Sequence, residues 1–233
     1  MKYLAALALG LIVGVAALFA LLYFNPLTTN NRLSPLSVSD NQVITFNYSA
    51  VATDALVYTN DGESQVPPHP TKVLQLWEPT VRRTAAMAMV LRDSRGQPAA
   101  IGIKFSSDSE STRVLNGEAI ADSVWHVYAP GQGSLFVEQQ ENYWNYVRDI
   151  VIPARWSSGN NWRGNWNGSI TSGPGALGTS RVVGGSGISA GLETDGVESL
   201  SAKAYSVEFG PVAMDAELAI EIPRRDAALS QDP

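Results

Sequence analysis

The chain has 233 residues, a formal net charge of -6 and no cysteine, and only 16% of its residues are charged. Its Lys and Arg residues are scattered, which excludes a nucleic-acid surface, because such surfaces need clustered basic side chains. The lack of cysteine excludes disulfides, thiolate nucleophiles and Cys-ligated zinc. His69 and His126 are the only histidines, too few for a multi-His centre, although carboxylates could still hold a hard cation. We therefore predict no resident metal and no cofactor.

The first predicted element is a transmembrane helix over residues 3–24, which follows a cytoplasmic N-terminus of residues 1–2. The run from Tyr3 to Phe24 has no charged residue and is long enough to cross the roughly 30 Å hydrocarbon core of a bilayer. A cleaved signal peptide has a shorter apolar region that ends in small residues. This run ends in Tyr23 and Phe24, bulky aromatics that favour the headgroup level. We therefore predict an uncleaved signal-anchor that contacts membrane lipid.

Two further features of this helix concern its orientation and its partners. Lys2 precedes the helix and the next basic residue is Arg32, so the positive-inside rule places the N-terminus in the cytoplasm. We expect a single-pass protein of a bacterial-type inner membrane with its C-terminal domain outside the cytoplasm, in the periplasm. Gly10 and Gly14 form a G-x-x-x-G spacing that lets two helix backbones approach closely. This spacing predicts self-association or a membrane-protein partner.

Composition divides the rest of the chain into three parts. Residues 25–40 contain two prolines and many small polar residues, which is typical of a linker. Residues 41–223 form the predicted extracytoplasmic β-rich domain. Residues 224–233 carry no pattern and are predicted to be a flexible tail.

Alternation of apolar and polar residues dominates the β-rich domain. In 212–222, Met214, Leu218 and Ile220 fall on one face and Asp215 and Glu217 on the other, which predicts a strand with one buried face. The same period predicts two further buried sets on other strands: Ile101, Ile103 and Phe105, and Val124, His126 and Tyr128.

Turn signals separate these runs, at 60–62, 93–96, 130–133 and 210–211. Many short strands with glycine-rich turns predict a mainly β fold, an antiparallel barrel or sandwich. Residues 84–92 and 138–151 fit helical and strand spacing about equally. One or two short helices could therefore pack on the sheet.

One sequence motif suggests a nucleophile and is better explained as a turn. Gly187, Ser189 and Gly191 match G-x-S-x-G, which holds the serine nucleophile of α/β hydrolases. That arrangement needs a histidine later in the chain, and both histidines precede Ser189. A Gly/Ser turn in a β protein is the better interpretation.

Aromatic residues give the best candidates for binding and for catalysis. Trp156, Trp162, Arg163 and Trp166 crowd an Asn/Gly-rich segment, and exposed tryptophans can stack on a ligand or partner. We assign ligand or partner binding to these four residues. Carboxylates near aromatics can do acid–base work, so the candidates for catalysis are Glu138, Tyr143 and Arg148.

The expected function is that of a membrane-anchored extracytoplasmic β-domain that acts as a binding module or as an accessory subunit of a membrane protein complex. The alternative is a barrel enzyme that acts on a small hydrophobic substrate. A deep lumen lined by Glu, Arg and Tyr would favour the enzyme, and a filled core with an exposed Trp patch would favour the binding module.

Overall fold

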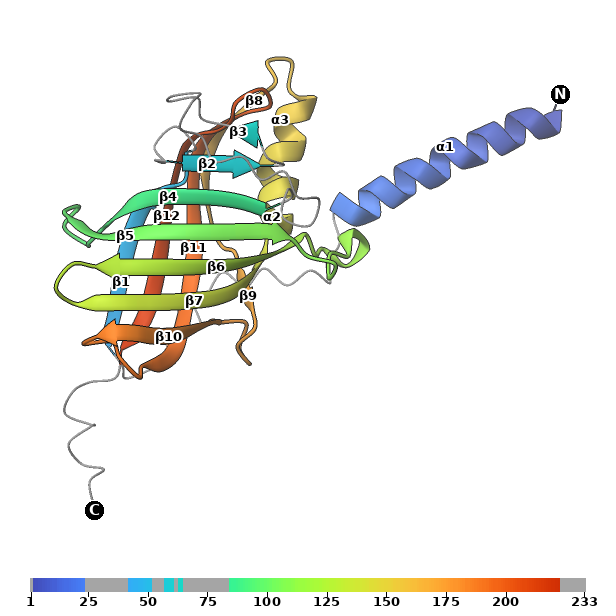
Figure 1. Cartoon of the computed structure of the whole chain (residues 1–233). Helices are drawn as coiled ribbons and strands as arrows, with labels where there is room; N and C mark the ends of the chain where they lie inside the picture. The colour runs from blue at the N-terminus through green and yellow to red at the C-terminus, as the bar shows by residue number, and fades with distance from the viewer. Residues whose placement is uncertain (1, 24–41, 52–56, 61–62, 65–83, 223–233) are drawn as a thin grey trace.

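The computed structural model describes residues 2–23, 42–51, 57–60, 63–64 and 84–222 (Figure 1). The predicted linker over 25–40, the tail over 224–233 and most of the turn over 60–62 lie outside these residues. The helical elements are α1 (Lys2–Tyr23), η4 (Val114–Asn116), α2 (Trp144–Tyr146), the π-helix η5 (Val147–Val151) and α3 (Ile152–Trp156). The strands are β1 (Gln42–Ser49), β2 (Val57–Asn60), β3 (Glu63–Ser64), β4 (Thr84–Arg92), β5 (Pro98–Asp108), β6 (Ile120–Ala129), β7 (Gly133–Asn142), β8 (Asn161–Ser169), β9 (Thr171–Gly173), β10 (Ser180–Gly187), β11 (Glu193–Ser206) and β12 (Gly210–Ile222).

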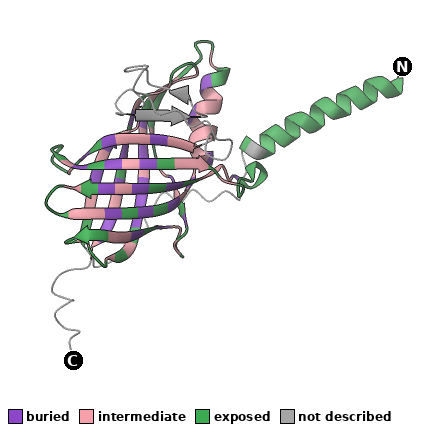
Figure 2. Ribbon diagram, in the orientation of Figure 1, coloured by how far each residue is buried: buried purple, intermediate pink, exposed green. Residues whose placement is uncertain are grey.

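Helix α1 is apolar and exposed along its length. Its segment Lys2–Leu21 has a mean hydropathy of 2.7 and is 0% buried, and Figure 2 shows this helix almost wholly exposed. The predicted N-terminal apolar helix is thereby confirmed. Its length and composition suffice for a membrane span, and its insertion in a membrane stays a prediction.

The strands of the β-rich domain form an antiparallel sheet that curls back on itself. Its path runs β1-β12-β11-β10-β7-β6-β5-β4, and β4 meets β1 again through the pair Asn47 and Arg92. Strands β4, β5, β6, β7 and β10 form a front layer, and β1, β12 and β11 cross behind them as a back layer (Figure 1). The mainly β antiparallel prediction is confirmed, and the strands close as a ring that is not a regular barrel.

The ring departs from a regular barrel at the strands around β11. The first part of β11 pairs with β10, whereas its later part, Ser199–Ser206, pairs with β8. On the other side, β7 pairs with the short β9. The described strands show no pairing between β8 and β7, and the helical segment α2–η5–α3 connects them along the chain. The ring is therefore open at this end.

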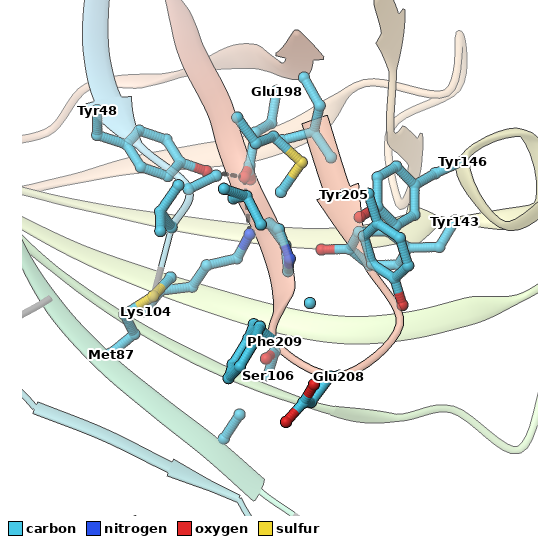
Figure 3. Close-up of a pocket in the computed structure, with 18 residues that line it drawn as sticks. Tyr48, Met87, Lys104, Ser106, Tyr143, Tyr146, Glu198, Tyr205, Glu208 and Phe209 are labelled. Carbon is cyan, nitrogen blue, oxygen red and sulfur yellow. Dashed lines mark hydrogen bonds and ion pairs between the residues drawn. The ribbon is translucent and has the colours of Figure 1, made fainter. Parts of the chain in front are cut away.

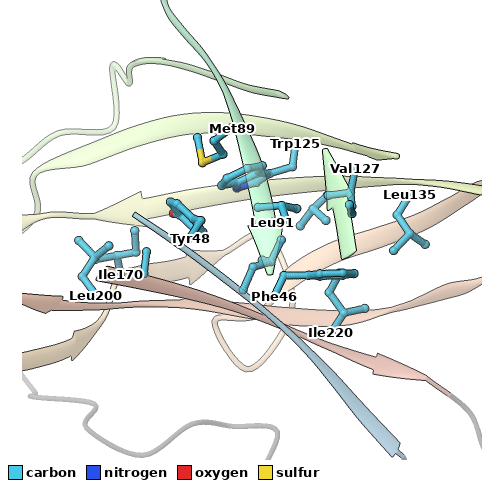
Figure 4. Packing of buried hydrophobic residues seen from close by; sticks show 14 of the residues in the cluster. Phe46, Tyr48, Met89, Leu91, Trp125, Val127, Leu135, Ile170, Leu200 and Ile220 are labelled. Carbon is cyan, nitrogen blue, oxygen red and sulfur yellow. The ribbon is translucent and has the colours of Figure 1, made fainter. Parts of the chain in front are cut away.

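Alternating side chains from both layers fill the space between them. On β12, Met214, Ala216, Leu218 and Ile220 are buried, whereas Asp215 and Glu217 are exposed, so the predicted face is confirmed over 214–220. At the two ends of the strand the prediction is wrong, because Val212 is exposed and Glu221 is buried. The buried apolar residues of β12 pack against Phe46, Leu91, Trp125 and Val137, among other core residues (Figure 4). Gly102 makes room for the ring of Trp125, because a Cβ at position 102 would lie 2.8 Å from it.

The structure decides between helix and strand for 84–92 and 138–151, and it shows which faces of β5 and β6 are buried. Residues 84–92 are strand β4, and 138–151 divides into the end of β7 and the start of the helical segment. The predicted faces of β5 and β6 are wrong, because Ile101, Phe105, Val124 and Tyr128 point outward and are exposed. The reason is that the alternate positions carry the buried residues, among them Ala100 and Lys104 on β5 and Ser123, Trp125 and Val127 on β6.

His126 shares this outer face and is not a core residue. Its ring stacks on Phe136 of β7 with 4.7 Å between ring centroids.

Candidate functional site

A cavity of about 1010 Å³ lies at the open end of the ring (Figure 3). Most of the described residues around it are apolar or aromatic, and the polar ones are Lys104 and Glu198 together with Ser106 and the exposed Glu208. The lining residues are Tyr48, Ala50, Val51, Ala85, Met87, Lys104, Ser106, Tyr143, Tyr146, Glu198, Leu200, Tyr205, Glu208, Phe209, Gly210, Pro211, Val212 and Met214. A mainly apolar concavity with a few convergent polar groups is the usual form of a small-molecule site.

Lys104 of β5 lies at the inner end of this cavity and is the centre of a buried ionic cluster. Its Nζ atom lies 2.6 Å from Glu141 Oε1 and 2.7 Å from Glu198 Oε1. It also lies 5.1 Å from the centroid of the Trp125 ring, within the range of a cation–π contact. Lys104 comes from the front layer and Glu198 from the back layer, so the cluster joins the two layers inside the ring.

Both carboxylates accept four donors each. Glu198 accepts hydrogen bonds from Tyr48, Lys104, Trp125 and Gln139. Glu141 accepts them from Lys104, Ser123, Gln139 and Tyr143, at 2.6–2.7 Å. Only an ionised carboxylate is purely an acceptor, so this donor set fits two carboxylates around one ammonium. Buried charges need this degree of pairing, because a buried ion without partners is strongly destabilising.

The electrostatics of the cluster shift the pKa values of its members. Burial raises the pKa of Glu141, but the charge of Lys104 and hydrogen bonds from Lys104, Tyr143 and Ser123 outweigh it, so the pKa is lowered overall. Burial lowers the pKa of Lys104, but Glu141 and Glu198 outweigh that effect, so the pKa is raised overall. Burial, and then the charge of Glu198, raise the pKa of Tyr48 well above its usual value. All three groups therefore hold their neutral-pH protonation states strongly.

Tyrosines form one wall of the cavity. Tyr143 and Tyr146 come from the start of the helical segment, and the ring of Tyr146 makes edge contacts with Tyr205 and Trp166. Tyr205 reaches the cavity because β11 is irregular between Ala202 and Tyr205, which changes the alternation of its side chains. The Tyr146 hydroxyl is buried without a hydrogen-bond partner among the described residues, and burial raises its pKa. It is a free hydrogen-bonding group beside the cavity.

The chemistry available here is binding of a small molecule with one polar end. Lys104 has three N–H donors, and its two carboxylate contacts leave one for another acceptor. Within the described residues, no group of three or more His, Cys, Asp or Glu could hold a metal ion.

The three candidates for catalysis do not form one site. Tyr143 lines the cavity and donates to Glu141. Glu138 lies on the outer face of β7, opposite Arg181 of β10, because it alternates with the inward Gln139 and Glu141. Arg148 pairs with Asp149 at 2.7 Å, and this hydrogen bond raises the pKa of Arg148 although burial opposes the shift. The proposed grouping of Glu138 with Tyr143 and Arg148 is therefore not seen.

The Trp segment occupies two different environments. Trp156, at the end of α3, is 74% exposed. Trp162 and Trp166 on β8 are half-buried and pack against the core, and Trp166 donates to Asp149 at 3.2 Å. Arg163 between them is exposed. None of these four residues is among the described residues that line the cavity, and their role in recognition stays a prediction.

Four residues of the cluster, Lys104, Glu198, Gln139 and Tyr48, carry no signal in the sequence that marks them as functional. Lys104 alternates with Ile103 and Phe105, and a lysine opposite apolar residues normally points to solvent. No local signal separates this lysine from a surface one. Ser189 falls between Gly187 and Gly191, both at positive φ, in the connection of β10 to β11, as predicted for a turn.

No family model matches this chain, and a search of curated proteins gave no match. The candidate site therefore rests on the geometry of the cavity and its cluster.

Proposed function

We propose that the chain is a membrane-anchored extracytoplasmic binding module whose β-domain takes up a small, largely apolar ligand in the cavity at the open end of the ring. One observation carries this proposal. A cavity of about 1010 Å³ has aromatic and aliphatic walls and a buried polar cluster at its inner end. Ligand pockets commonly have volumes of roughly 300–1,000 Å³ and this composition.

The cavity residues suit a ligand with two unlike ends. Met87, Leu200 and Met214 offer apolar contact, and the tyrosine wall offers rings against which a flat or aliphatic body can pack. Lys104, at the inner end, and the hydroxyl of Tyr146, which has no hydrogen-bond partner among the described residues, would bind the polar end. Phe209, which is 75% exposed, and Val212 lie at the mouth, where they would contact a ligand during entry.

Binding of a neutral apolar dye tests the proposal. Full-length protein in lipid nanodiscs is titrated with N-phenyl-1-naphthylamine, and the emission of empty nanodiscs is subtracted. We expect saturable binding that Ala85→Trp weakens by about tenfold or more, a loss of about 1.4 kcal/mol, because the ring would fill the cavity. Asp215→Trp introduces the same side chain on the outer face of β12 and should leave binding unchanged. Equal binding by both variants and the wild type would remove the cavity as the site.

The location of the domain needs a separate experiment. The apolar helix Lys2–Leu21 and the charge asymmetry between Lys2 and Arg32 support an uncleaved anchor with the domain outside the cytoplasm. Alkaline phosphatase fused after Pro233 should be active, and the purified protein should begin at its original N-terminus. An inactive fusion, or a new N-terminus between about residues 17 and 30, the range where a signal peptide would be cut, would contradict this topology.

An enzyme that acts on a small hydrophobic substrate is the second candidate function. It is favoured by the ionisable cluster at the inner end of the cavity, since buried ionisable groups with shifted pKa values often mark catalytic sites. Against it, protein donors fill both carboxylates. Conversion of a ligand extracted from the purified protein, abolished by Lys104→Met under conditions where urea unfolding shows that the variant is folded, would favour the enzyme.

A further inference from the structure

The outer face of the front layer carries a continuous apolar patch. Its members come from four neighbouring strands, and the large ones are exposed by 41–49%: Val90, Ile101, Phe105, Val124, Tyr128 and Phe136. We propose that this patch pairs with the same patch of a second copy of the chain, so that the protein works as a membrane-anchored dimer. The inference rests on the proposed anchoring and goes beyond ligand binding.

Strand register shows that the patch is contiguous. One cross-strand row contains Val90, Ile101 and Tyr128. The next contains Ile103, His126 and Phe136, and the third contains Phe105 and Val124. Neighbouring residues in a row lie about 4.5–5.5 Å apart, so the three rows form one surface. Large contiguous apolar patches on soluble domains mark interaction sites.

The charges around the patch lie at its border. Glu138 and Arg181 face each other at the β7–β10 corner, and Asp122 follows in the next row on β6. The centre holds the stacked rings of His126 and Phe136. Two such faces can meet without burying a charge, as in sheets that pack face to face about 10 Å apart.

Helix α1 favours a second copy of the chain as the partner that covers the patch. Gly10 and Gly14 share one face of α1, and no atom lies within 4 Å of where a Cβ would stand on either. This spacing allows close approach of two such helices in a bilayer. Two copies held in one membrane also meet at a raised effective concentration. Helix and sheet face are thus separate parts of the same chain that both suit pairing with a copy of itself, as a two-fold dimer requires.

Cysteine cross-linking tests the pairing, because the natural chain contains no cysteine. Single variants Ile101→Cys, Val124→Cys and Phe136→Cys are treated in native membranes with a short bis-maleimide. Val43→Cys is the control, since Val43 has similar exposure but lies on the back layer. We expect a cross-linked species of twice the chain mass for the patch variants and little for the control. Light scattering of the purified wild type should give a dimer.

Other results would overturn the proposal. These are a monomer with no cross-link, equal cross-linking at Val43→Cys, or a product with a different polypeptide. Quenching of a fluorophore on Phe136→Cys by spin-labelled lipid would show that the bilayer covers the patch instead. A double variant, Phe105→Gln with Val124→Gln, should shift light scattering toward the monomer and still bind N-phenyl-1-naphthylamine. Loss of dye binding by the wild type would contradict the cavity proposal and leave the dimer test intact.

Discussion

The two layers of the ring differ in where they place their polar side chains. The back layer is conventional over the middle of β12, which turns Leu218 and Ile220 inward and Asp215 and Glu217 toward solvent, and its main exception is the buried Glu198 of β11. The front layer is partly inverted, because β5 turns Lys104 inward and Ile101 and Phe105 outward. Both strands alternate with the same period. Alternation therefore shows that a strand has two faces, and the neighbouring layer decides which one is buried.

The inversion has a local cause at the open end of the ring. There the interior contains a cavity, and the front layer supplies Lys104, Ser123, Gln139 and Glu141 to the cluster around Glu198. A lysine inside the ring is stable only because two carboxylates surround it. The same strand then has apolar residues left for its outer face, which become the surface available for a partner.

The largest predicted loss of stability comes from a charge placed on the buried face of β12. Leu218→Asp would put an unpaired charge in the core and should cost about 4 kcal/mol or more of unfolding free energy. Leu218→Ala should cost about 2–5 kcal/mol, which provides a measurable variant if the first does not fold. Glu217→Gln, one residue away on the outer face, should change stability by no more than about 0.5 kcal/mol. Urea unfolding checks all three, and equal effects at 217 and 218 would mean that the face of β12 is wrongly placed.

A second change breaks the inverted layer. Lys104→Met would leave two buried carboxylates without their cation and should cost about 3–5 kcal/mol. Lys203→Met removes an exposed lysine from the back layer and should cost about 0.5 kcal/mol or less. Urea unfolding at neutral pH compares the two variants. A cost at Lys104 no larger than at Lys203 would show that the cluster does not form.

The pH dependence of the unfolding free energy, measured for the wild type and for Lys104→Met, sharpens this test. The folded-state pKa of Glu141 is lowered, so the stability that it contributes is present above the ordinary pKa of Glu and is lost as pH falls through the folded value. The pKa of Lys104 is raised, so its contribution is present below the ordinary pKa of Lys and is lost as pH rises through the folded value. Wild-type stability should therefore fall at both extremes. In Lys104→Met the acid side should lose this dependence, because burial then favours the protonated carboxyl.

A smaller effect on stability should distinguish the half-buried Trp166 from the exposed Trp156. Trp166→Ala removes a ring that packs against the core and should cost about 2–3 kcal/mol, less than a fully buried tryptophan. Trp156→Ala removes an exposed ring and should leave the melting temperature unchanged. If recovery of a partner falls for Trp156→Ala alone, the predicted role of this segment in recognition narrows to that residue. If Trp166→Ala is as stable as the wild type, the ring belongs to a free surface.

The smallest predicted effect is a concentration-dependent change in melting temperature that distinguishes the outer face of the front layer from that of the back layer. In dilute detergent solution, where monomers dominate, Val124→Thr on the front layer and Thr45→Val on the back layer should each change stability by about 0.5 kcal/mol or less. At high protein concentration only Val124→Thr should lower the melting temperature, because association stabilises the folded state. Thermal unfolding at two protein concentrations measures this difference. The same response from both variants would remove the contrast between the faces.

Local sequence signals predicted the parts of the structure that depend on local physics. The apolar run of α1, the alternation of β12 and the glycine turn around Ser189 were all readable, because each follows from neighbouring residues. The faces of β5 and β6 were not, because on β5 Ile101 and Phe105 are more apolar than the inward Ala100 and Lys104, and on β6 apolar residues such as Val124 and Val127 occur on both faces. The site was missed for the same reason. Lys104 and Glu198 lie 94 positions apart, and only the closure of the ring brings them together.

That closure has a consequence for how the chain acquires its structure. Strand β1 pairs along its length with β12, so that Gln42 lies opposite Ile222. Strand β1 is synthesised first, and its hydrogen-bonding edge has no β12 to pair with until nearly the whole domain has been synthesised. Pairings of such long sequence separation form slowly and leave apolar edges open to aggregation in the meantime. Successful biogenesis of this protein should therefore depend on chaperones that shield the nascent β1 segment until β12 has emerged.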